Sequence, residues 1–114
     1  MLPYLRKRAV VRSHAHQMVT DLGENLPAVV SFDLQRTSSR KRAVHVLRKV
    51  SADAAKFALT NDLGFMSKAQ LANKFQWGLR ELNYSDEFID MATVAVTMSL
   101  SGSYESLQYA HRRG

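Results

Sequence analysis

The feature that most constrains this chain is a basic stretch in its middle that contains no acid. No acidic residue occurs between Asp33 and Asp53, and this gap contains residues 40–50, which read RKRAVHVLRKV. Three of the central residues, Val44, His45 and Val46, favour a β-strand, with Lys and Arg on both sides of them. The stretch therefore predicts a basic strand. Helical spacing of its apolar residues, with Ser39 as the cap, is the rival interpretation.

Two helices and a short turn are expected after this strand. Ser51 can cap the first helix, whose alanines favour helix, and Gly64 ends it. Ser67 can cap the second helix, over residues 68–82. The apolar positions of this second helix recur at helical spacing and are Leu71, Ala72, Phe75, Leu79 and Leu82.

Further elements are expected on both sides of this core. Residues 1–23 predict a basic N-terminal helix that stops at Gly23. Residues 29–35 alternate like a strand, and a short helix starting at Pro27 is the competing interpretation. Residues 85–102 predict a helix that is apolar on nearly its whole circumference. A chain of 114 residues has little to cover such a helix with, so this helix is expected to form the core of a dimer. A short helix is also expected within residues 103–114.

The positive charge lies entirely in the first half of the chain. Residues 1–53 hold ten Lys/Arg and four acids, whereas residues 54–114 hold six of each, so the net charge of +6 belongs to the first half. Such a polarised distribution indicates a side that faces a polyanion. A solvated basic face is the plainer explanation.

Several function classes lack support in the sequence. There is no cysteine, which removes disulfides, Cys-based zinc sites and a thiol nucleophile. The pair His14 and His16 would point apart on a helix, so no metal is expected. No glycine-rich phosphate loop and no Ser/His/Asp set is present, so we expect neither an enzyme nor a cofactor nor a small-molecule substrate. No apolar run is long enough to span a membrane. A cytoplasmic, nucleoid-associated protein is expected.

Residues 42–82 resemble the ribbon-helix-helix family of bacterial DNA-binding proteins, the group of the Arc, MetJ and CopG repressors. The resemblance consists of the basic strand 42–49, the helix 51–63, and the turn 64–68 that opens the next helix. It covers about 40 of the 114 residues. The family commonly has Gly-x-Ser at the turn, and Met66 is one residue too many here. Lys56 and Thr60 also stand where apolar residues are usual.

The resemblance implies a mainly α protein with a short β-ribbon, in which a ribbon-helix-helix-like core over residues 40–82 carries extra N- and C-terminal helices. It implies a homodimer whose antiparallel ribbon enters the major groove of double-stranded DNA. Ser67 and Lys68 would hold a phosphate at the start of a helix. The residues expected to contact DNA are Arg36, Arg40, Lys41, Arg42, His45, Arg48, Lys49, Ser67 and Lys68.

Two alternatives stay open on the sequence. Residues 29–35 could form the ribbon, with residues 39–50 and 52–61 as its helices, although Asp33 would then face phosphates. The expected function is a small dimeric, sequence-specific transcription regulator of a bacterium, phage or plasmid. The alternative is a helical interaction or inhibitor protein, or a small subunit of a nucleoprotein complex.

Overall fold

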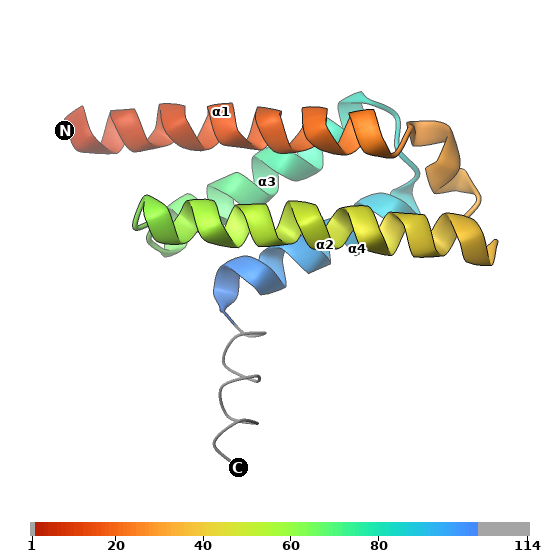
Figure 1. Cartoon of the computed structure of the whole chain (residues 1–114). Helices are drawn as coiled ribbons and strands as arrows, with labels where there is room; N and C mark the ends of the chain where they lie inside the picture. Colours follow the sequence, from red (N-terminus) through yellow and green to blue (C-terminus); the bar gives the residue numbers. More distant parts are fainter. Residues whose placement is uncertain (1, 103–114) are drawn as a thin grey trace, which may run out of the picture.

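The computed structural model describes residues 2–102, and this part of the chain is helical throughout its regular structure (Figure 1). The α-helices are α1 (Leu2–Asn25), α2 (Thr37–Thr60), α3 (Phe65–Glu81) and α4 (Asp86–Ser101). A short 3-10 helix, η1 (Ala28–Phe32), connects α1 to α2. The prediction for residues 103–114 lies outside the described residues.

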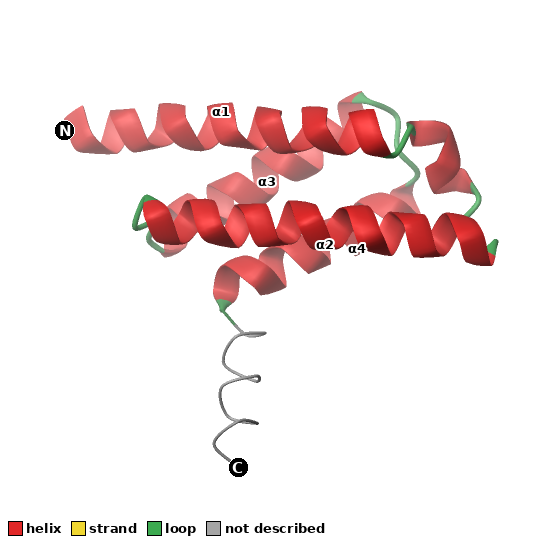
Figure 2. Ribbon diagram, in the orientation of Figure 1, coloured by secondary structure: helices red, strands yellow, loops and turns green. Residues whose placement is uncertain are grey.

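The prediction of a β-ribbon is wrong, because residues 2–102 contain no strand (Figure 2). Residues 42–49 lie in the middle of α2, and the alternative ribbon 29–35 contains most of η1. The ribbon-helix-helix core over residues 40–82 is therefore two helices, α2 and α3. The helix expected over residues 51–63 is the C-terminal half of α2.

Helix α2 forms because one apolar stripe runs along its whole length. Its buried residues recur every three or four positions and are Ala43, Val46, Leu47, Val50, Ser51, Ala54 and Ala58. This period matches an α-helix and continues across Ser51 without a break. Ser51 is therefore a buried residue inside a helix and not a cap. Burial along this stripe outweighs the local strand preference of Val44 and Val46.

The other helices were predicted closer to their observed bounds. Helix α1 continues through Gly23 to Asn25, two residues beyond the expected stop. Helix α3 begins at Phe65 with Gly64 at its N-cap, so Ser67 does not cap it. Ser85 caps α4 by accepting a hydrogen bond from the Phe88 N–H at 3.1 Å. Gly102 ends α4 in the left-handed region, at φ 76°.

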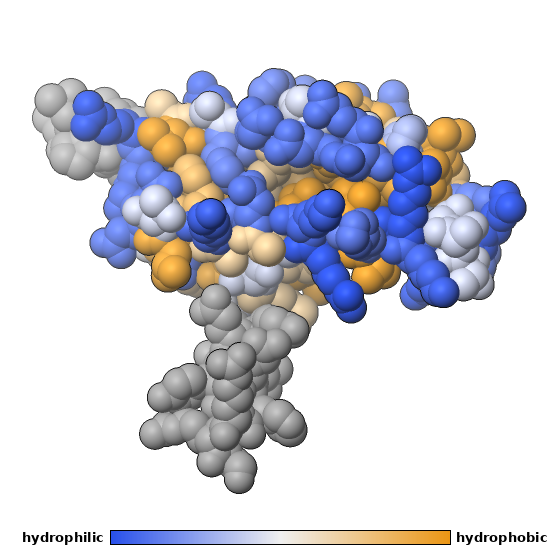
Figure 3. All heavy atoms as spheres, viewed as in Figure 1, coloured by the Kyte–Doolittle hydropathy of each residue, from blue (hydrophilic) through white to orange (hydrophobic). Residues whose placement is uncertain are grey.

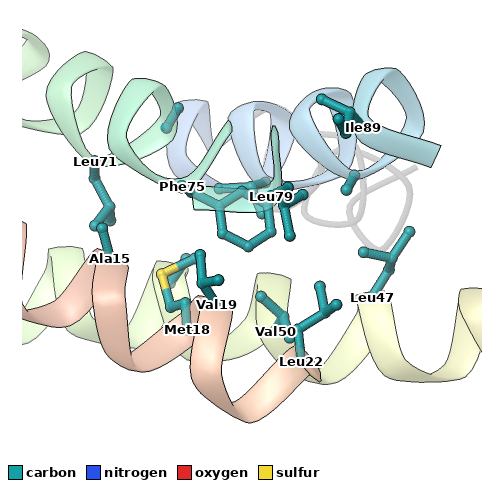
Figure 4. Packing of buried hydrophobic residues seen from close by; sticks show 14 of the residues in the cluster. Ala15, Met18, Val19, Leu22, Leu47, Val50, Leu71, Phe75, Leu79 and Ile89 are labelled. Carbon is teal, nitrogen blue, oxygen red and sulfur yellow. The ribbon is translucent and has the colours of Figure 1, made fainter. Parts of the chain in front are cut away.

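The helices pack in two layers. Helices α1 and α2 lie side by side and antiparallel, with α3 and α4 behind them (Figure 1). Helix α1 packs chiefly on α3, and α2 packs chiefly on α4. Figure 4 shows Met18 and Val19 of α1 beside Phe75 and Leu79 of α3. One hydrophobic core therefore joins all four helices.

Two polar contacts join η1 and the end of α1 to the start of α4. The Tyr84 hydroxyl donates a hydrogen bond to the Leu26 carbonyl oxygen at 2.6 Å. Ser85 contacts Ser31 twice: its N–H donates to the Ser31 hydroxyl at 3.0 Å, and its own hydroxyl donates to the Ser31 carbonyl at 2.8 Å. These groups are largely buried, and a buried polar group without a hydrogen-bond partner lowers the stability of the fold. Each of these bonds removes that cost.

Gly78 sets how closely α3 approaches α1, and this contact gives a first prediction. A Cβ at position 78 would lie 2.6 Å from Cγ2 of Val19, whose side chain is stiff. We expect Gly78→Ala to lower the free energy of unfolding by about 1–3 kcal/mol, although the same change in an uncrowded helix stabilises. Urea unfolding followed by circular dichroism measures this.

Two controls make the Gly78 test specific. In a Val19→Ala background, Gly78→Ala should be neutral or stabilising, because the crowding atom is gone. A Cβ at position 64 would have no neighbouring atom within 4 Å, so Gly64→Ala should be tolerated far better than Gly78→Ala. Equal losses from Gly78→Ala in both backgrounds would contradict the proposed crowding.

Tyr84 gives a second prediction, which depends on pH. Burial raises the pKa of the Tyr84 phenol above its ordinary value of 10.0. The folded chain therefore holds this proton more tightly than the unfolded chain. The resulting stability is fully present below about pH 10 and is lost as the pH rises through the folded pKa.

We expect Tyr84→Phe to lower the free energy of unfolding by about 1–2 kcal/mol near neutral pH, because the Leu26 carbonyl loses its partner. Above about pH 10 the gap between wild type and variant should narrow, since only the wild type has this phenol to ionise. Urea unfolding of both proteins at neutral and alkaline pH measures the gap. A gap that does not change with pH would argue against this role for Tyr84.

Candidate functional site

The basic residues of α2 are exposed along the length of the helix. Since the apolar stripe of α2 turns toward α4 and α1, the remaining arc of the helix points to solvent. Figure 3 shows hydrophilic side chains gathered over α2 on this side of the molecule. We call the following exposed residues the basic face: Arg36, Arg40, Lys41, Arg42, His45, Arg48, Lys49 and Lys56.

Few counter-charges lie near the basic face. Asp53 is the one acid of α2, and its Oδ2 lies 2.9 Å from Nε2 of His14. Arg36 pairs with Asp33 at 3.5 Å. Among residues 2–102 no other member of the basic face forms an ion pair. The positive charge of α2 is therefore almost uncompensated within the described part of the chain.

The start of α2 is electrostatically unfavourable. Its first turn contains no acid, and its N-cap, Arg36, makes no side-chain capping bond. Arg40, Lys41 and Arg42 add three cations where the helix dipole already places positive charge. The arrangement disfavours folding and favours an incoming anion, since the free N–H groups of a helix start bind anions as well.

A groove lies between the basic face and α1. It has a volume of about 540 Å³, and its floor is formed by Met18, Val46 and Val50. Asp21 lies on its α1 rim and Lys49 on its α2 rim. Figure 3 shows apolar atoms exposed between the hydrophilic side chains of the two helices. Its walls thus carry both signs of charge, unlike the basic face itself.

Contacts between α1 and α2 close both ends of this groove. At one end, Nη2 of Arg42 donates a hydrogen bond to the Asn25 carbonyl oxygen at 3.1 Å. At the other end, His14 reaches Asp53, and its ring stacks on Phe57 with centroids 3.8 Å apart. These contacts fix how α2 presents its cations beside α1.

The structure brings together seven of the nine residues expected to contact DNA. Those between Arg36 and Lys49 all lie on the basic face, although in a helix and not in a strand. Ser67 and Lys68 lie in the first turns of α3, beyond the C-terminal end of α2. Arg40 and the end of α2 are separated by about 30 Å of helix, so the expected phosphate clamp is not part of this face.

Two features were not predicted from the sequence. Lys56 belongs to the basic face, because the helix continues past Ser51 and brings it round. An apolar groove also lies between α2 and α4, lined on one side by Ala55 and Leu59 and on the other by Met91 and Met98. The sequence signal that could have predicted this groove is a second row of apolar and small residues in α2, which begins at Val44.

Two further observations bear on other classes of site. The histidines of α1 do not form a joint site, because His14 is half-buried against Phe57 while His16 is exposed. No group of three potential metal ligands lies close together within residues 2–102. In the same residues, no helix has the length and apolar character needed to cross a bilayer.

The comparisons with known proteins gave no relative for this chain. No family model matched it, and neither the curated proteins nor the solved structures contained a significant match.

The charge at the start of α2 gives a third prediction. Replacing Arg40 and Lys41 together by Gln should raise the free energy of unfolding by about 0.3–1 kcal/mol per residue at low salt, because each cation opposes the helix dipole. The gain should shrink at high salt, which screens exposed charges. Urea unfolding at both ionic strengths measures it. Lys49→Gln, in the middle of α2, is the matched control and should change stability less.

Proposed function

We propose that this chain binds nucleic acid through phosphate contacts along the basic face of α2. Double-stranded DNA is the first ligand to test. The observation that carries the proposal is the exposure of Arg40, Lys41, Arg42, Arg48, Lys49 and Lys56 without an ion pair in residues 2–102. Uncompensated, clustered cations of this kind supply the sequence-independent part of nucleic-acid affinity.

The dimensions of the basic face suit a phosphate backbone. Arg40 and Lys56 are separated by about 24 Å along the helix. Phosphates follow one another at about 3.4 Å along a DNA strand axis, so this length covers about seven of them. Along this length the number of phosphates about equals the number of Lys and Arg side chains.

Contacts to phosphates position a protein but carry no sequence information. The proposal therefore needs no strand in the major groove. The basic face of α2 takes the place of the predicted β-ribbon as the surface that contacts nucleic acid. A role in transcription regulation, and a dimer that reads a two-fold site, would each need contacts beyond those of the basic face. The alternative role, as a small subunit of a nucleoprotein complex, is favoured by one further observation: the apolar groove between α2 and α4 leaves a second surface for a partner.

Salt dependence gives the fourth prediction. If six cations contact phosphates, the logarithm of the binding constant should fall against the logarithm of salt concentration with a slope of roughly −5. Fluorescence anisotropy of a labelled DNA duplex measures this slope. Lys41→Gln combined with Lys49→Gln should weaken binding and make the slope less negative by roughly 2.

Lys74→Gln is the matched control, because Lys74 is exposed on α3 and lies outside the basic face. It removes one positive charge and should leave the slope nearly unchanged. Single-stranded DNA and double-stranded RNA probes would show which nucleic acid is preferred. Absence of binding to all three at low salt, or an equal effect from Lys74→Gln, would refute the proposal.

A further inference from the structure

A second surface of the molecule is a groove between α2 and α4, which we call the apolar groove. Its volume is about 760 Å³. Exposed apolar side chains lie along it: Leu59 is 80% exposed and Met98 is 47% exposed. Its lining also includes Val44, Arg48, Ala55 and Lys56 of α2 and Met91 and Ala95 of α4.

Small side chains create the apolar groove. Helix α2 packs chiefly on α4, and both helices bury alanines: Ala54 and Ala58 of α2 and Ala92 of α4. Above this contact, Ala55 and Ala95 line the groove without filling it. Methionine adapts its shape to different partners, and two methionines lie on the α4 side. The groove therefore combines a small-residue floor with adaptable apolar walls.

The charge of the apolar groove is one-sided. Among residues 2–102, the charged residues that line it are Arg48 and Lys56, both on α2 and both exposed. Neither forms an ion pair within residues 2–102. They are eight residues apart, which is about 12 Å along the helix. The α4 wall contributes no charged residue to the lining.

We propose that the apolar groove binds an amphipathic helix of a partner protein whose apolar stripe is bordered by acidic residues on the α2 side. From Val44 to Leu59 the groove runs along about 22 Å of helix, which is the length of about four helical turns. Apolar side chains at every third or fourth position would enter it. Two acids about two turns apart would reach Arg48 and Lys56 together.

A second copy of this chain fits the groove less well. It would bring another net charge of +6. The exposed acids of its helix α4, which are Asp86, Glu87 and Asp90, all lie within the first two turns. They could neutralise one of the two cations but not both. Charge complementarity therefore favours an acidic partner helix.

This inference goes beyond nucleic-acid binding and does not rest on it. The apolar groove and the basic face share Arg48 and Lys56, whereas Arg40, Lys41 and Arg42 lie outside the groove. A bound acidic helix would cover part of the basic face and leave the start of α2 free. Such a partner would weaken nucleic-acid binding without abolishing it.

The test uses the full chain and a designed, fluorescein-labelled helical peptide. The peptide has Leu at every third or fourth position over about four turns and two Glu residues two turns apart on one flank. A second peptide has Lys in place of Glu. We expect the Glu peptide to bind with a Kd on the order of micromolar and the Lys peptide to bind at least roughly tenfold more weakly. Fluorescence anisotropy measures both.

Variants assign the binding to the groove. Ala55→Leu fills the groove and should weaken Glu-peptide binding at least roughly tenfold, whereas Ala69→Leu, on α3 and outside the groove, should not. Arg48→Glu combined with Lys56→Glu should reverse the preference toward the Lys peptide. Circular dichroism melts show that each variant is folded. Since Ala55→Leu changes no charge, it should leave DNA binding intact. The proposal of peptide binding and the proposal of DNA binding are therefore tested independently.

Three outcomes would overturn the inference. One is no binding of the Glu peptide at millimolar concentration. Another is equal affinity for the Glu and Lys peptides, which would show that the two cations play no part. The third is a dimer of the wild type in sedimentation velocity that Ala55→Leu converts to a monomer, because the groove would then hold a second copy.

Discussion

The buried stripe of α2 determines which way most of the charged side chains of this helix point. Because Val46, Leu47, Val50 and Ala54 turn inward against α4 and α1, the cations between them have only the opposite arc available. A strand would have sent alternate residues to opposite faces. A helix of the same sequence gathers them on one side. The positive face is thus a consequence of core packing, and the two cannot be changed independently.

That packing holds together charges that repel one another. The basic face concentrates its cations on a single helix, and the start of that helix has the wrong polarity for them. Within residues 2–102 the pair of Arg36 with Asp33 and the hydrogen bond from Arg42 to the Asn25 carbonyl compensate part of this charge. Neither removes the excess charge. An external anion would neutralise more of it, which connects the electrostatics of folding to the proposed binding.

The sequence predicted the elements whose ends and faces are encoded locally. Ser85 and Gly102 bounded α4 correctly, since a cap and a left-handed glycine are local signals. The errors arose where a local preference competed with a distant contact. Val44, His45 and Val46 favour a strand, and Ser51 looks like a cap, but the stripe that decides the outcome extends from residue 43 to residue 58. The basic face was predicted with the wrong geometry. The apolar groove was not predicted, because it depends on which helix packs beside α2.

The two surfaces meet along one edge of α2, and this arrangement limits how the protein can act. Arg48 and Lys56 belong to both, so they can face a phosphate or a partner carboxylate but not both at full strength. The carboxylate would arrive with apolar contacts in the groove, whereas the phosphate arrives with neighbouring phosphates along the basic face. Salt would weaken the phosphate contacts far more than the binding of the partner helix, because burial of apolar area does not depend on screened charge. If both proposals hold, ionic strength would shift the balance between the two proposed ligands.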